Sequence, residues 1–134
     1  MITNNGNEPH KIIGGPRVAR HGTSLGLEEL IATVKSRYPA KPFCLVRNWT
    51  IFLADLTPHE LVTVERAGHL PLFVYAFEVI FDSKGRFQPG DWVRSSMCVQ
   101  FLEGFLFETR NTVYVLVGDG AEQKASLKSI FSFQ

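Results

Sequence analysis

The segment LPLFVYAFEVIFD, residues 70–82, carries apolar side chains at almost every position. In a strand, successive side chains point to opposite faces of the sheet, so the residues form two alternating sets. Both sets are largely apolar here, with Glu78 the only charged residue before Asp82. A strand that is apolar on both faces needs packing partners on both sides. The sequence therefore predicts a central strand at 70–82, covered on its two faces by other elements.

The residues after this strand predict an antiparallel meander. Asp82-Ser83-Lys84-Gly85 fits a type I turn with glycine in the left-handed position, which is typical of a hairpin connection. Three strand-like runs come next, at 91–101, 105–110 and 113–118. Short turns at 103–104 and 110–112 separate them. Strands joined by turns this short run antiparallel to each other.

Helices are expected on both sides of residues 43–55 and at the C-terminal end. The first begins near residues 24–26 and ends before Pro39, and its apolar side chains recur at helical spacing: Leu27, Leu30, Ile31, Val34 and Tyr38. The second covers 57–69, with Thr57 as N-cap, Pro58 as first helical residue and Glu60 completing a capping box. Gly68 stands where glycine commonly ends a helix. The spacing within 127–131 is compatible with a third, short helix.

Two segments complete the prediction of the fold. In FCLVRNWTIFLAD, residues 43–55, Arg47-Asn48 is either a tight turn between two short strands or a bulge in one longer strand. Residues 1–23 are rich in Asn, Gly, Pro and Arg without periodicity, which predicts a flexible N-terminal arm. The rest of the chain, 24–134, is predicted to be a single domain. Its fold class is α+β: a mainly antiparallel sheet with a C-terminal β-meander, packed by two short helices.

Composition narrows the classes of function. The formal net charge of +1 gives no general attraction for nucleic acid or membrane, so such binding would need a local patch. The apolar run LPLFVYAF is far shorter than the roughly 20 residues of a transmembrane helix. The N-terminal residues MITNNGNEPHK lack the apolar core of a signal peptide, which predicts a cytoplasmic protein. Cys44 and Cys98 belong to no CxxC or Cys/His cluster and are expected to be reduced thiols.

No motif predicts catalysis, a metal or a cofactor. Gly118-Asp119-Gly120 is half of a dinucleotide fingerprint, but Gln123 replaces the third glycine. His59-Glu60 lacks the second histidine of a zinc HExxH motif, since Thr63 stands there. Ser95, Ser96 and Cys98 lie on a strand-like run and not on the sharp turn typical of a nucleophilic serine. We therefore expect a protein without catalytic residues, metal or cofactor.

One surface has the composition of a binding site. If 92–101 is a regular strand, its more apolar set faces the core: Val93, Ser95, Met97, Val99 and Phe101. The alternate set faces outward and includes Trp92 and Arg94. With nearby turns and strands, the candidate binding surface consists of Trp92, Arg94, Arg110, Tyr114 and Arg86. Aromatic residues with arginine are typical of interaction hot spots and of single-stranded nucleic-acid platforms. The alternative is that Trp92 is a core residue and that the arginines are solvated or paired with Glu103 and Glu108.

The stretch VIFDSKGRFQPGDWVRSSMCVQFLEGFLFETRNTVYVLVGDG, residues 79–120, resembles the C-terminal part of small uncharacterised proteins of proteobacteria and their prophages. PGDWVRSS and ETRNTVYVLVG are its most specific pieces, and the resemblance covers about a third of the chain. That group has no established activity, so the resemblance implies no catalytic residue. It implies a bacterial, cytoplasmic protein, often carried by mobile elements.

Three functions follow as hypotheses. The first is a small non-enzymatic accessory protein that binds another protein, such as a host defence or regulatory factor, through the candidate surface. The second is a nucleic-acid-binding protein that uses the same surface and the basic N-terminal arm. The third is an enzyme of unrecognised type. No membrane partner is expected, and a homodimer would form if the strand-prone segment 113–118 lay at a free sheet edge.

Overall fold

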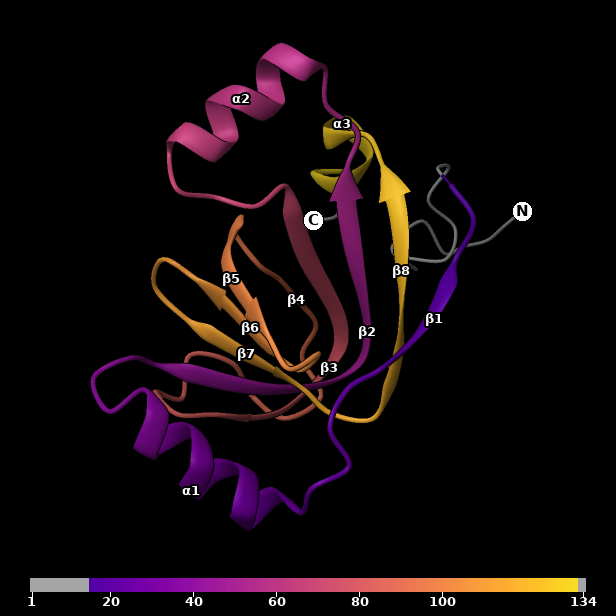
Figure 1. Cartoon of the computed structure of the whole chain (residues 1–134). Helices are drawn as coiled ribbons and strands as arrows, with labels where there is room; N and C mark the ends of the chain where they lie inside the picture. Colours follow the sequence, from indigo (N-terminus) through magenta and orange to yellow (C-terminus); the bar gives the residue numbers. More distant parts are fainter. Residues whose placement is uncertain (1–14, 133–134) are drawn as a thin grey trace.

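The computed structural model describes residues 15–132, which form eight strands and three helices (Figure 1). The strands are β1 (Val18–His21), β2 (Phe43–Ala54), β3 (Leu72–Asp82), β4 (Val93–Arg94), β5 (Cys98–Leu102), β6 (Leu106–Thr109), β7 (Val113–Leu116) and β8 (Asp119–Ala125). The helices are α1 (Leu27–Arg37), α2 (Pro58–Arg66) and α3 (Leu127–Ile130). The strands form one mixed, mostly antiparallel sheet, so the predicted α+β class is confirmed.

Strand β2 is the hub of the sheet. One of its edges pairs antiparallel with β3 over most of its length. The other edge is shared, because β7 pairs in parallel with residues 43–46 and β8 in parallel with residues 50–54. Between these regions lies Asn48, whose φ of 56° is the left-handed conformation that asparagine tolerates. Residues 43–54 are therefore one long strand that bends at Asn48 and is more central than β3, and the irregularity in the β2–β3 ladder lies between Leu45 and Val46.

The strands on the two sides of β2 curl toward each other. One side carries β3 and β4, and the other carries β7, β6 and β5 as an antiparallel meander. Residues 95–97 connect β4 to β5, the outermost strands of the two sides. Near this connection the Leu70 amide donates to the Cys98 carbonyl at 2.9 Å. The predicted C-terminal meander is confirmed, but the run 91–101 is divided into β4 and β5. β7 is paired on both edges, so segment 113–118 does not supply a free sheet edge.

Part of the predicted N-terminal arm belongs to the sheet. β1 pairs antiparallel with β8, in a register that runs from Val18↔Glu122 to His21↔Asp119. The prediction of an irregular arm is therefore wrong for residues 18–21. Their composition hides the strand, because all four residues are exposed and no apolar alternation arises. Residues 1–14 of the predicted arm lie outside the described residues.

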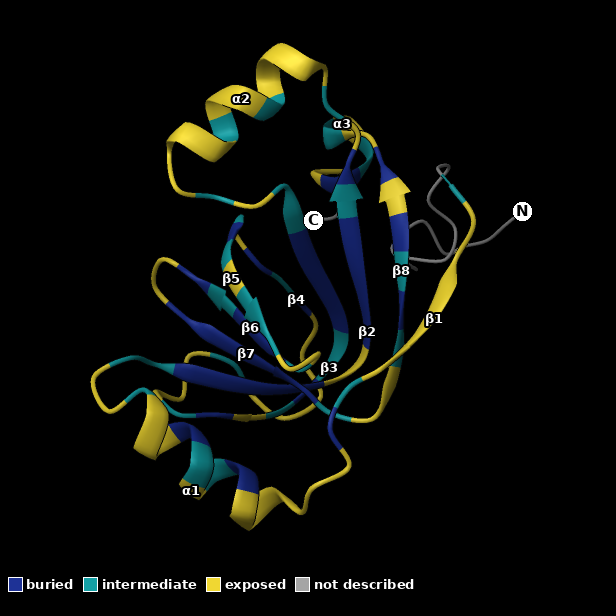
Figure 2. Cartoon of the chain, in the orientation of Figure 1, coloured by how far each residue is buried: buried dark blue, intermediate teal, exposed yellow. Residues whose placement is uncertain are grey.

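Three apolar clusters hold the sheet in this shape. The central strands, which supply most of their residues, are dark blue for buried in Figure 2. The largest fills the inside of the curl with side chains from six strands, including Trp49 and Phe107. The second lies beneath α1, where Leu30 and Val34 are fully buried against β2, β6 and β7. The third lies on the outer face of β2, β3 and β8, where Ile130 of α3 is fully buried.

The two long helices form as predicted but pack differently. α1 ends at Arg37, with Tyr38 as its C-cap directly before Pro39, and its apolar stripe faces the sheet. α2 has the predicted capping box: Thr57 Oγ1 accepts from the Glu60 amide at 3.2 Å, and the Glu60 carboxylate accepts from the Thr57 amide at 2.8 Å. No residue of α2 is buried, however. The helix is therefore formed by local signals and receives little support from the core.

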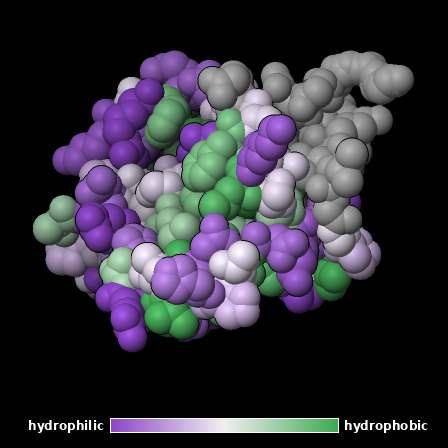
Figure 3. Space-filling view, turned by 90° about the horizontal axis from the view of Figure 1, so that it is seen from above, coloured by the Kyte–Doolittle hydropathy of each residue, from purple (hydrophilic) through white to green (hydrophobic). Residues whose placement is uncertain are grey.

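The end of the molecule that bears α2 and α3 exposes apolar side chains. Val62 of α2, Leu70 after it and Phe131 after α3 are between 38% and 44% exposed. Seen from this end, apolar side chains gather in the middle of the face, between hydrophilic ones (Figure 3). Similar exposure occurs singly elsewhere, as at Val18 and Leu25, but a contiguous group of exposed apolar side chains is a feature of surfaces that bind partners.

Candidate functional site

Trp92 lies next to β4, at the edge of the sheet. Its indole ring stacks on the ring of Tyr75, with centroids 5.4 Å apart and planes within 9° of parallel. Tyr75 is fully buried, whereas Trp92 is 38% exposed. The prediction that Trp92 and Arg94 share an outward face is confirmed, because Val93 between them is buried in the inner cluster. Trp92 is therefore a partly exposed ring held on a fixed platform.

Arg94 extends this surface toward α3. Its guanidinium carbon lies 4.8 Å from the centre of the Phe131 ring, a favourable cation–π contact. Phe131 packs edge-on against Phe73 at 5.2 Å, and on the other side Phe77 packs edge-on against Tyr75 at 5.5 Å. We call this continuous surface the aromatic face. It consists of Phe73, Tyr75, Phe77, Trp92, Arg94 and Phe131.

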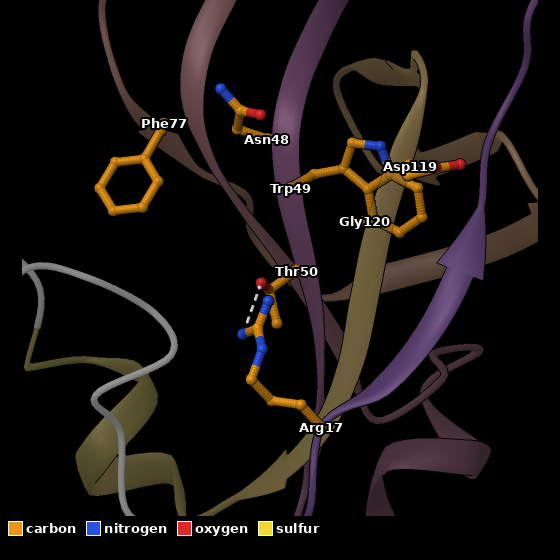
Figure 4. Close-up of a pocket in the computed structure, with 7 residues that line it drawn as sticks. All are labelled: Arg17, Asn48, Trp49, Thr50, Phe77, Asp119 and Gly120. Atoms are coloured by element: carbon orange, nitrogen blue, oxygen red, sulfur yellow. Dashed lines mark hydrogen bonds between the residues drawn. The ribbon is translucent and has the colours of Figure 1, made fainter.

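A hollow of about 380 Å³ opens beside Phe77 (Figure 4). It is lined by Arg17, Asn48, Trp49, Thr50, Phe77, Asp119 and Gly120. The Arg17 side chain reaches across to β2, where its Nη1 donates to Thr50 Oγ1 at 3.2 Å. Thr50 and Arg94 flank Tyr75 in the sheet as its partners on β2 and β4. Two arginines therefore reach the aromatic face from opposite sides of Tyr75.

The joint between β7 and β8 shapes this hollow. Trp49 Nε1 donates to the Val117 carbonyl at 3.2 Å, at the point where the pairing of β2 passes from β7 to β8. Gly118 makes the transition with a φ of 72°. A Cβ atom at Gly120 would overlap the Trp49 ring, so only glycine fits there. The incomplete dinucleotide fingerprint at 118–120 is thus explained as a structural joint.

The groups in the hollow and on the aromatic face are suited to binding. They offer guanidinium, amide and hydroxyl donors beside aromatic walls. Cys44 and Cys98 are buried free thiols, and burial raises the pKa of each to about 12, which keeps them in the unreactive thiol form. Within residues 15–132, no group of three or more His, Cys, Asp or Glu side chains could hold a metal ion.

Three of the five predicted binding residues lie elsewhere, so the prediction of one shared surface is wrong. Tyr114 is only 7% exposed and belongs to the inner cluster, where burial raises its pKa to about 12. Arg86 follows the end of β3 remote from Tyr75 and is held by Asp82, with Nη2 and Oδ1 2.7 Å apart. Arg110 is exposed in the turn between β6 and β7.

The alternation assumed for 92–101 also fails beyond Ser95. Cys98 is fully buried in the inner cluster and Met97 packs on the cluster under α3, the reverse of the predicted faces. Ser95 marks the break, because its hydroxyl accepts from the Val74 amide at 2.9 Å and donates to the Ser96 carbonyl at 2.7 Å. Alternation predicts the faces of a strand only while the ladder continues.

Sequence reasoning missed four residues of the aromatic face and one of the hollow: Phe73, Tyr75, Phe77, Phe131 and Arg17. A signal for the first three was present in 70–82, where large aromatic residues alternate with smaller ones such as Val74 and Ala76. Val74 and Ala76 fill the crowded inside of the curl, which leaves the aromatic set on the outer face. Arg17 gave no comparable signal, because it lies in a segment without periodicity.

The fold and the site define a small α+β domain with a partly exposed sheet face of aromatic residues and arginine. Residues 21–132 match the family described as Domain of unknown function (DUF6957), and the chain belongs to this family. The match includes the aromatic face but not Arg17. No curated protein and no solved structure matches the chain. Among residues 15–132, no helix has the length and apolar composition needed to cross a membrane.

Proposed function

We propose that this chain is a small, non-enzymatic accessory protein that binds another protein through the aromatic face. Its proposed setting is the cytoplasm of bacteria that carry it in the chromosome or in a prophage, and its partner is a host defence or regulatory factor. The resemblance of PGDWVRSS and ETRNTVYVLVG to proteobacterial and prophage proteins supports this setting. The observation that carries the binding function is the stack of the partly exposed Trp92 on the buried Tyr75.

The stack makes Trp92 suitable as an anchor. A ring that is already held in place loses little conformational entropy on binding. More of the free energy gained from its contacts therefore contributes to affinity. Tryptophan, tyrosine and arginine are also the residues most often found in hot spots. Arg94 and Arg17 give this region positive charge on both sides of Tyr75. The partner segment should therefore offer an apolar side chain for Trp92 and a carboxylate for an arginine.

A nucleic-acid ligand on the same face has less support. The second hypothesis combines this face with the basic arm, but the described cations of that arm already have partners in the sheet. Arg20 pairs with Glu122 at 3.2 Å, and His21 Nδ1 lies 2.7 Å from Asp119 Oδ1. Arg17 donates to Thr50. These contacts favour protein binding as the function of the aromatic face.

The test compares Trp92→Ala with Phe81→Ala. Phe81 is a matched control, because it is 39% exposed, close to Trp92, but packs on Phe43 away from the aromatic face. Affinity capture from a bacterial lysate should recover a stoichiometric partner with the wild type and with Phe81→Ala. Trp92→Ala should weaken the complex by about 30-fold or more, the loss typical of a hot spot of about 2 kcal/mol.

Two outcomes would contradict the proposal. One is the absence of any stoichiometric partner, and the other is equal affinity of Trp92→Ala and Phe81→Ala for the partner. Sedimentation of the purified chain completes the test. A dimer that Trp92→Ala dissociates would identify the partner as a second copy of this chain.

A further inference from the structure

Positive charge collects at the end of the molecule where α1 leads into β2. Three carboxylates near this end each have a cation: Glu108 has Lys41 at 2.6 Å, Asp82 has Arg86 at 2.7 Å and Glu103 has Arg37 at 2.6 Å. Three further cations, Lys35, Lys84 and Arg110, form no ion pair within residues 15–132. Since the whole chain has a formal charge of +1, this end is more positive than the protein as a whole.

These cations line two adjoining hollows around the loop 38–42. The first, of about 360 Å³, has Lys35, Ser83 and Lys84 in its wall. The second, of about 540 Å³, has Arg110 and Asn111. Both hollows share the loop residues Tyr38, Pro39, Ala40 and Lys41. Among the described residues, the first hollow therefore combines two cations that form no ion pair, and the second combines one, with an apolar wall that both hollows share.

The loop between the hollows is held in place on several sides. The Tyr38 amide donates to the Val34 carbonyl at 2.8 Å and closes α1. The Val113 amide donates to the Pro42 carbonyl at 3.0 Å, which ties the loop to β7. The Lys41–Glu108 pair fixes it to β6, because both side chains are largely buried. The hollows are thus formed before any ligand arrives, as is usual for small-molecule sites.

We propose that this basic end binds the phosphate groups of a nucleotide. Lys35, Lys84 and Arg110 supply charge for phosphate oxygens, for which lysine and arginine are the common partners. The Tyr38 ring with Pro39 and Pro42 supplies an apolar wall for a base, and Asn111 and Ser83 supply hydrogen bonds. Volumes of about 360 and 540 Å³ lie in the range of small-ligand sites. The nucleotide is either free or part of a single strand, in which bases are accessible.

This site is separate from the proposed protein-binding surface. None of the residues that line the two hollows belongs to the aromatic face. Arg110, which the sequence grouped with Trp92, belongs to this basic end. The two sites can therefore be tested independently, because substitutions at one leave the other intact.

The experiment uses a fluorescent single-stranded thymidine oligonucleotide and ADP as probes for the full chain. Three phosphate contacts predict that log K falls with log salt with a slope of about −2, from about −0.7 per contact on a single strand. Each of Lys35→Gln, Lys84→Gln and Arg110→Gln should reduce that slope by about 0.7. Lys128→Gln, at an exposed position of α3, is the control and should leave the slope unchanged.

The competing probes decide the source of the nucleotide. ADP that displaces the oligonucleotide identifies a free nucleotide as the ligand, whereas binding of the oligonucleotide alone identifies a strand. A poly-glutamate peptide that binds as tightly, with the same loss in the three variants, overturns the assignment to phosphate. No binding of oligonucleotide or ADP at low salt also overturns it. If Arg110→Gln and Lys128→Gln show the same slope of log K against log salt, the ligand does not bind at the basic end.

Discussion

The two halves of β2 differ in what covers them. Before the bend at Asn48, both faces of the sheet are buried, one by the inner cluster and one by α1. After the bend, the inner face is again buried, but the outer face bears Trp92 and Phe131, which are 38% and 44% exposed. The helices follow the same division, since α1 buries Leu30 and Val34 completely and α2 buries no residue.

This difference separates residues that stabilise the fold from residues available to a partner. A side chain that is fully buried contributes its apolar area to folding and leaves nothing for a binding partner. An exposed side chain can be replaced at little cost to stability, usually within about 0.5 kcal/mol. Substitutions in the covered half should therefore lower the free energy of unfolding, whereas substitutions at the exposed positions of α2 should change it much less.

The largest effect is expected from Arg86→Met, at the covered end of the sheet. The Asp82 side chain has no exposed area, and Arg86 holds it with Nη2–Oδ1 and Nε–Oδ2 distances of 2.7 and 3.1 Å. Removal of the guanidinium leaves a buried carboxylate without its cation, which typically costs about 3–5 kcal/mol. Urea unfolding at neutral pH should show this loss. Arg110→Met is the control and should cost less than about 0.5 kcal/mol.

The pH dependence of this pair gives a second measure. Burial alone raises the pKa of the Asp82 carboxyl, but hydrogen bonds from the Arg86 side chain and from the Arg86 and Phe87 amides outweigh burial and lower the pKa. The stability from Asp82 is therefore present above the unfolded pKa of about 3.9 and is lost as pH falls through the folded value. In Arg86→Met the effect of burial on the Asp82 pKa dominates, so protonation in acid removes the buried charge. The difference in the free energy of unfolding between the wild type and Arg86→Met should therefore become smaller as the pH falls. A difference that becomes larger in acid would contradict this account.

The next effect is the contrast between Leu30→Ala in α1 and Leu61→Ala in α2. Leu30 is fully buried in the cluster beneath α1, so its truncation should cost about 2–5 kcal/mol. Leu61 is only partly buried, and the same substitution should cost about 1 kcal/mol or less. Both variants keep a good helix former, so helix propensity does not confuse the comparison. Equal losses in urea unfolding would show that α2 supports the core as much as α1 does.

The fold was predictable where local signals and tertiary packing agree. The capping box at Thr57 and Glu60 predicted α2, and the spacing of Leu30 and Val34 predicted both α1 and its buried stripe. Prediction failed at β1, whose pairing with β8 depends on backbone hydrogen bonds that exposed side chains do not reveal. The sharing of one edge of β2 by β7 and β8 is likewise a non-local property of the sheet.

The candidate site was predictable only in part, for a related reason. Trp92 and Arg94 were placed correctly because Val93 between them marks the inner face. Tyr114 was misplaced because its strand lies within the sheet with both faces covered, so alternation could not identify an exposed side. Arg86 was misplaced because its partner, Asp82, is recognised only in the folded turn. Composition identifies candidate residues, but their grouping depends on strand order.

The smallest effect, and the most specific, is expected from Thr57→Ala. Loss of an N-cap costs about 1 kcal/mol of helix stability, but α2 buries no residue, so the loss should remain local. Hydrogen exchange of the α2 amides should become about five-fold faster, while exchange in β2 and the urea midpoint stay unchanged.

Ser126→Ala is the matched control, because Ser126 caps α3 by accepting from the Ser129 amide at 3.1 Å and Ile130 of α3 is fully buried. Loss of the N-cap in Ser126→Ala should therefore lower the free energy of unfolding of the whole domain. A global loss in Thr57→Ala would mean that α2 is coupled to the core and would remove the contrast between the two halves of the sheet.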